Sequence, residues 1–329
     1  MRIARFLAKR SLHGLFVVWG VVTTAFLLRF VAPGSAISVV APIDATPEMK
    51  EAIALELGLN KPLYVQYAEY IAGLFRGDMG YSYVSNTEAS TRIFSKLPAT
   101  LELAFAGTLI AIVLSIPLGV ISATRRNTPA DYGATLFSLL GISTPNFWLG
   151  IMLVLVFAVE FNLFPTSRRP IGLDVAMASL LFELNVDPIV RWLSHIILPA
   201  VALGTYFTAL ITRLTRSEML DELGKTYINA VRAKGIPEVL VQYRHALRNA
   251  LIPVVTVLGL QLGSVIGGAV ITEAVFSWPG LGTLIINAVN ARDWPIIQGS
   301  LIVIGSGFVI VNIGVDALYA YLNPEIDNE

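Results

Sequence analysis

The chain has no cysteine among its 329 residues, and only 14% of them are charged. The absence of cysteine excludes a disulfide framework, a thiolate metal site and a cysteine nucleophile, and it leaves the redox compartment open. Lys and Arg together number 23, as do Asp and Glu, so the formal net charge is zero. This balance does not favour a basic nucleic-acid-binding protein, a strongly acidic chain or a disordered one.

Hydrophobic residues are abundant instead, at 55% of the chain with a mean hydropathy of +0.70. A soluble domain has about 45–50% apolar residues. Six segments are long and apolar enough to cross a bilayer, which takes about 20 residues. They are residues 11–32, 99–123, 132–161, 193–213, 250–275 and 295–322. The sequence therefore predicts an all-α, polytopic membrane bundle of six transmembrane helices.

The N-terminal segment begins with basic residues, as a secretory signal peptide does. Its apolar stretch is long, no clear small-x-small cleavage site follows, and further spans come after it, so we expect an uncleaved first helix. If the N-terminus is cytoplasmic, the inner segments carry thirteen Lys and Arg, against four in the two short outer loops. The positive-inside rule then predicts that both termini face the cytoplasm.

A long polar loop at 33–98 follows the first span and exceeds what a plain connection needs. Thr-Pro-Glu at 46–48 indicates a helix start and Gly58 its end. A second helix is expected over 62–75, followed by a tight turn in 77–82. We expect a small helical cap on the outer end of the bundle. It either packs there alone or also meets an external partner.

The second long loop, 214–249, is polar and net positive, and lies on the predicted cytoplasmic side. Residues 221–234 lack proline and end in cations, which suit a helix C-terminus. Gly235 fits the position after a helix, and Pro237 fits the first turn of a second helix that reaches about residue 248. The sequence predicts two helices that meet at a sharp corner. A solvated hairpin and a docking surface for a partner are both compatible with this pattern.

Catalytic and nucleotide-binding motifs are poorly supported. Gly-Lys-Thr at 224–226 matches the end of a phosphate-binding loop, but Met219 stands where that motif needs its first glycine. The three histidines lie on different segments without metal-ligand spacing, and no Gly-x-Ser-x-Gly occurs. We therefore expect no ATPase site and no resident cofactor in this chain.

Charged and small residues inside the spans are the candidates for the translocation pathway. Arg29, Glu273 and Asp316 should face the bundle interior, a water-filled cavity or an interface, because a charge facing lipid is costly. None forms the mid-membrane carboxylate chain of a proton-coupled carrier. Gly263 and Gly267 form a small-xxx-small pair for close helix contact or for movement.

The loop sequences resemble a known family. Tyr-Ile-Asn-Ala-Val-Arg-Ala-Lys-Gly at 227–235, followed by His-Ala-Leu-Arg-Asn-Ala-Leu-Ile-Pro at 245–253, is similar to the ATPase-docking loop of permease subunits in dipeptide/oligopeptide-type, binding-protein-dependent ABC importers. Supporting similarities lie at residues 32–34, 77–82, 97–103 and 275–282. The long loop at 33–98 is similar to that of the first of the two permeases in such systems.

The resemblance implies a heterodimer with a second, homologous permease in the plasma (inner) membrane. Two cytoplasmic ATPase subunits would bind ATP and Mg, and an extracytoplasmic solute-binding protein would deliver di- or oligopeptides; no nucleic acid is implied. It divides the chain into a first helix (1–32), a cap (33–98), a permease core (99–324) and a cytoplasmic tail (325–329). The implied docking residues are Tyr227, Ala230, Arg232, Ala233, Lys234, Gly235, Ile236 and Pro237.

Two departures from the family pattern stand out. Val231 occupies a position that is usually alanine, and the chain ends in an acidic segment, 323–329, rather than a basic tail. Other solutes, namely oligosaccharides, nickel chelates or haem, are alternatives to peptides. An ion-gradient-driven secondary transporter and an intramembrane enzyme are the alternative classes of function.

Overall fold

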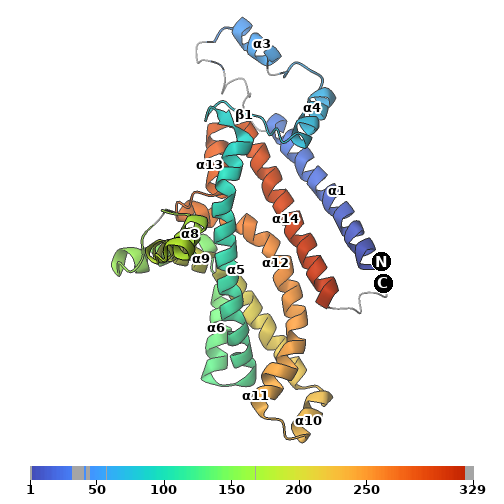
Figure 1. Ribbon diagram of the computed structural model, residues 1–329, viewed down its shortest axis with the longest axis vertical. Coiled ribbons are helices and arrows are strands. Elements are labelled where there is room, and N and C mark those ends of the chain that lie inside the picture. The colour runs from blue at the N-terminus through green and yellow to red at the C-terminus, as the bar shows by residue number, and fades with distance from the viewer. Residues whose placement is uncertain (1, 32–40, 42–44, 57, 167, 323–329) are drawn as a thin grey trace.

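The computed structural model describes residues 2–31, 41, 45–56, 58–166 and 168–322 (Figure 1). Within them the one sheet is a hairpin of β1 (Tyr81–Ser82) and β2 (Thr87–Glu88). Five of the described helices could each cross a membrane, and a bent pair supplies a sixth span. The predicted all-α bundle is confirmed. The similarity at residues 32–34 and the acidic end at 323–329 lie outside the described residues.

The straight spans correspond to the predicted apolar segments. They are α1 (Arg2–Val31), α5 (Ala89–Thr124), α9 (Asp187–Leu223), α12 (Leu247–Val275) and α14 (Trp294–Leu322). Several run beyond the predicted ends. Aqueous helix ends are not limited by the thickness of the hydrocarbon, so hydropathy alone does not define them.

The start of α5 shows why a helix can extend beyond its apolar segment. It begins ten residues before the predicted span, and Pro98 lies inside it without ending it. Ala89 and Ile93 are fully buried in a cluster with residues of α14 and of α13 (Leu281–Ala291), a short helix that the sequence did not predict. Packing at the end of the bundle that carries the cap therefore extends the helix.

The third span is broken, so the prediction of one helix over 132–161 is wrong. α6 (Pro129–Ser143) is followed by α7 (Asn146–Leu153) and the π-helical turn η1 (Val154–Glu160), and the two parts are bent by 109°. Thr144 has extended backbone angles directly before Pro145. Proline disfavours the helical conformation in the preceding residue and lacks an N–H, so the helix ends there.

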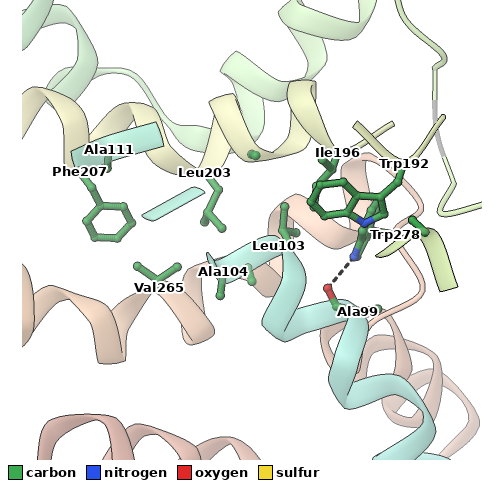
Figure 2. Packing of buried hydrophobic residues seen from close by; sticks show 13 residues of the cluster. Ala99, Leu103, Ala104, Ala111, Trp192, Ile196, Leu203, Phe207, Val265 and Trp278 are labelled. Carbon is green, nitrogen blue, oxygen red and sulfur yellow. Dashed lines mark hydrogen bonds between the residues drawn. The ribbon is translucent and has the colours of Figure 1, made fainter. Parts of the chain in front are cut away.

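The core lies between α5 and α9, with α12 packed beside them. Figure 2 shows Leu103 and Ala104 of α5 near Leu203 of α9 and Val265 of α12. A Cβ at Gly204 would lie only 2.6 Å from the backbone oxygen of Gly107. Small residues in membrane helices allow this close approach of backbones.

The two long loops lie at opposite ends of the bundle (Figure 1). The predicted cap helices are confirmed as α3 (Pro47–Glu56) and α4 (Leu63–Phe75). α10 (Thr226–Ala233) and α11 (Glu238–Leu240) occupy the other end. A further helix, α8 (Leu173–Glu183), precedes α9 and was not predicted.

Replacement of Gly204 by alanine tests the contact between α5 and α9. We expect Gly204→Ala to destabilise the chain by about 1–3 kcal/mol, because the methyl group must displace the α5 backbone. Gly267→Ala is the matched control, since no atom of the described residues lies within 4 Å of the Cβ position there. Thermal unfolding in detergent measures both. Equal midpoints for the two variants would contradict the close approach.

Candidate functional site

The corner at the end of the bundle begins with a break between α9 and α10. The sequence predicted one helix over 221–234, which is wrong, because residues 221–223 complete α9 and α10 begins only at Thr226. Lys225 has an extended backbone (φ −73°, ψ 149°) between the two helices. Gly224, a weak helix former, allows the chain to turn here.

The sharp turn after α10 is confirmed at Gly235. Its φ is +74°, a conformation that favours glycine, and its N–H donates to the Arg232 carbonyl at 2.9 Å. Pro237 was expected in the first turn of the second helix. It lies directly before α11 instead, because that helix begins at Glu238.

The helix after the corner is not the separate short helix that the sequence predicted. α11 continues through the π-helical turn η2 (Val241–Ala246) directly into the spanning helix α12. Helical backbone therefore runs from Glu238 to Val275. The apolar pattern did not reveal this continuity, because the first turns are polar and lie outside the membrane segment.

Hydrogen bonds between side chains of this protein stabilise the corner. The Tyr227 hydroxyl donates to Glu222 at 2.7 Å and accepts from Asn249 of α12 at 2.8 Å, and Lys225 also donates to Glu222. The hydrogen bond to Glu222 raises the pKa of Lys225. Burial, and then the bond to Glu222, raises the pKa of Tyr227. These bonds join α9, α10 and α12 at one point.

A second brace closes the turn itself. The Arg232 guanidinium binds the Glu238 carboxylate with two hydrogen bonds of 2.8 and 3.1 Å. The hydrogen bonds to this carboxylate raise the pKa of Arg232. This bidentate pair ties the last turn of α10 to the first turn of α11.

The implied docking residues divide into two groups. Ile236 packs with Ile228 and Val231 against the cluster below the corner, so the unusual valine fills the interior of the corner. Ala230 and Ala233 are exposed on the opposite side of α10. Lys234, Gly235 and Pro237 are exposed as well, and so are Tyr227 and Arg232, although these two also bond within the corner. Ile236 thus packs inward, whereas the other implied residues lie at the surface.

Glu273, a pathway candidate, is fully buried near the end of α12. Its carboxylate is bound by hydrogen-bond donors of the same chain. It accepts hydrogen bonds from the Thr100 hydroxyl at 2.6 Å and from the backbone N–H groups of Gly282 and Thr283 at 2.7 and 3.1 Å. The carboxylate therefore caps the N-terminus of α13 and ties it to α5 and α12.

The loop before α13 is shaped around this carboxylate. A Cβ at Gly280 would lie 2.2 Å from a Glu273 oxygen, and one at Gly282 would lie 2.4 Å from the Val270 Cα. Trp278 anchors the loop by donating from its indole to the Ala99 carbonyl at 2.7 Å (Figure 2). Close packing in this loop thus explains why glycine and tryptophan occur at these positions of 275–282.

The other pathway candidates have partners on separate elements. Arg29 donates to Gln66 of the cap helix α4 and lies over the rings of Phe26 and Phe30, at 4.9 and 4.7 Å from their centroids. Asp316 pairs with Arg10 of α1 at 3.3 Å. The structure does not gather these charges into one site.

The glycine pair on α12 is also divided between two environments. Gly263 is buried, and a Cβ there would meet Phe308 of α14 at 2.6 Å, whereas Gly267 is exposed. Among the described residues, only the first of the two glycines makes a close helix contact.

Sequence reasoning missed two ion pairs that hold helix ends. Arg169 pairs with Glu102 of α5, which also accepts from the Leu173 N–H and the Trp192 indole at 3.0 and 3.2 Å. Arg216 of α9 pairs with Asp131 of α6 at 2.7 Å. Their position near span ends was visible in the sequence, but their pairing depends on the tertiary fold.

The chain matches two models of one transporter family. Residues 115–328 match the binding-protein-dependent transport system inner membrane component, and residues 3–104 match the N-terminal part of such membrane components.

Named relatives are similar over nearly the whole chain. The dipeptide transport system permease protein DppB of Escherichia coli K12 is 37% identical, covering 93% of this chain and 94% of the relative. The oligopeptide transport system permease protein AppB of Bacillus subtilis is also 37% identical, covering 99% and 100%. A solved chain of the MetNI methionine ABC transporter, in inward-facing conformations, has a TM-score of 0.52 at 16% identity and covers 70% of this chain and 96% of that chain. That likeness supports the fold.

Removal of the Tyr227 hydroxyl should loosen the corner. We expect Tyr227→Phe to speed trypsin cleavage after Lys225 about 5-fold, because Glu222 and Asn249 both lose their hydrogen bond to the Tyr227 hydroxyl. Tyr243→Phe is the matched control, since Tyr243 is exposed and its hydroxyl has no hydrogen bond among the described residues. Unchanged cleavage in the first variant would contradict the bracing role.

Loss of the Glu273 carboxylate should destabilise the contacts of α13 with α5 and α12. Glu273→Ala leaves the N–H groups of Gly282 and Thr283 buried without this acceptor, at about 1–3 kcal/mol for each. We expect a clearly lower midpoint of thermal unfolding. Glu160→Ala removes an exposed acid of a spanning segment and should have little effect. A midpoint unchanged by the first substitution would show that Glu273 is not a structural cap.

Proposed function

Because the chain belongs to the family of binding-protein-dependent transport system inner membrane components, we propose that it works as one of two permease subunits in an ATP-driven importer of di- or oligopeptides. The peptide assignment draws on the relatives named for dipeptide and oligopeptide transport. A second, homologous permease completes the pathway. An external binding protein delivers the solute on the side of the cap.

The corner around Gly235 is the proposed contact for a cytoplasmic ATPase subunit. The observation that carries this proposal is an exposed face of small residues, Ala230 and Ala233, held on a braced helix at the end of the bundle opposite the cap. Small side chains allow a partner to approach the helix closely. ATP and Mg belong to the ATPase subunits, and this chain supplies a passive element.

The helix that follows the corner provides a path for coupling. Helical backbone runs from Glu238 to Val275, where Glu273 caps α13 near the outer end. A displacement of the corner is therefore applied to one end of a helix whose other end holds the loop at 276–280. Coupling between distant sites requires rigid, contiguous elements of this kind.

The membrane orientation follows from the same arrangement. The proposal places the corner and both termini in the cytoplasm and the cap outside, in agreement with the positive charge of the inner segments. An ion-gradient-driven carrier is the alternative. The charges in the described spans favour it less, because Glu273 and Glu102 are engaged by donors near helix ends.

An added charge on the exposed face of α10 tests the docking proposal. We expect Ala233→Glu to insert normally but to reduce co-purification of the ATPase subunits at least about tenfold, because the larger, charged side chain opposes close approach. Ser217→Glu, on exposed α9 surface at the same end, is the matched control. Co-purification of the Ala233→Glu variant in normal yield would refute docking at this face.

Transport by the reconstituted complex tests the function separately. Uptake of a labelled dipeptide into vesicles should require ATP, the binding protein and all four membrane and ATPase subunits. Uptake by this chain alone under an ion gradient would establish the alternative.

A further inference from the structure

A cavity of about 290 Å³ lies between α6 and α9, where these helices approach the end of the bundle that carries the corner. Among its lining residues are Thr135 and Ser138 of α6 and Arg213 and Arg216 of α9. The peptide pathway, the docking face and the cap assign no role to this cavity.

The described residues do not balance the charge at the cavity. Arg216 is neutralised by Asp131 through hydrogen bonds of 2.7 and 3.0 Å. Arg213 is exposed, and it has no ion-pair or hydrogen-bond partner among the described residues. An unpaired arginine on a spanning helix is costly unless an anion or the headgroup region accompanies it. The cavity therefore favours an anionic ligand.

A buried hydroxyl points to the same conclusion. The Ser138 side chain is only 2% exposed, lines the cavity, and has no hydrogen-bond partner among the described residues. A buried hydroxyl without a partner is unfavourable, and a ligand in the cavity that it lines would supply an acceptor. It can donate to an acceptor oxygen on the molecule that Arg213 attracts.

The lining changes from polar to apolar along α6. This helix begins at Pro129, so residues further along it lie deeper in the bundle. Ala134 and Thr135 come first, Ser138 follows one turn later, and Leu139 and Ile142 line the deeper part. The neighbouring Leu136 and Leu140 are exposed, as expected of a face toward lipid. A ligand that fits has its charge near the helix start and a hydrocarbon portion deeper.

We propose that this cavity binds the phosphate and glycerol of an anionic phospholipid, with the start of one acyl chain along Leu139 and Ile142. Arg213 forms a charge-assisted hydrogen bond to the phosphate, and the Ser138 hydroxyl donates to a phosphate or ester oxygen. Basic pockets between membrane helices are suited to lipid headgroups. The inference requires a membrane-embedded chain and does not depend on the solute carried.

Native mass spectrometry of the full-length chain in mild detergent tests the proposal. The probes are phosphatidylglycerol and phosphatidylcholine with identical acyl chains, supplied in equal amounts. We expect one phosphatidylglycerol to be retained preferentially, and Arg213→Gln to weaken its binding roughly tenfold without changing that of phosphatidylcholine. Ser138→Val, which fills the cavity and removes the donor, should lower retention of phosphatidylglycerol.

Two comparisons can overturn this assignment. Arg126→Gln removes an exposed charge from the turn after α5, outside the cavity lining, and should leave retention unchanged. Equal losses from both arginine variants would show only diffuse attraction. Displacement of the lipid by inorganic phosphate would show a site for a soluble anion, and no preference between the two lipids would refute an anionic-lipid site.

Discussion

A carboxylate that leaves water has to be supplied with hydrogen-bond donors, and this requirement shapes both ends of the bundle. Glu102 of α5 accepts the N–H of Leu173, the first residue of α8, and Glu273 of α12 accepts two N–H groups at the start of α13. Each acid thus joins a long helix to the start of a short one. The short helices gain a cap, and the acids gain donors that lipid could not provide.

Asp131 meets the same requirement at the other end. It lies in the first turn of α6 and accepts from Ser122, from the Asn127 N–H and from Arg216. Because one buried acid engages α5, the following turn, α6 and α9, the ends of three helices are fixed together at this end of the bundle. The corner is built beside this fixed point, so its position relative to the core is defined.

Features that depend on local sequence were predictable. The long apolar segments identified the spans, and glycine after a helical stretch identified the turn at Gly235, because few other residues adopt its backbone conformation. The break at Thr144 was less visible, since proline inside a membrane helix can also be tolerated, as Pro98 and Pro117 are in α5. Sequence alone does not distinguish these outcomes.

Features that depend on distant contacts were not predictable. The sequence did not reveal that Arg232 binds Glu238, or that Ile236 packs below the corner. These contacts follow from how the corner folds and how α10 lies against α9 and α12. Burial and the choice of hydrogen-bond partner are properties of that packing, and a single sequence does not report them.

The bidentate pair between Arg232 and Glu238 has a thermodynamic consequence. A turn already closed by its own side chains loses little conformational entropy when another protein covers it. For the proposed docking of an ATPase subunit, this rigidity means that the turn need not fold on binding. A displacement of the turn would then move the attached helix rather than rearrange the loop. Because Glu238 also begins the continuous helix to Val275, the closed turn and that helix form one rigid element.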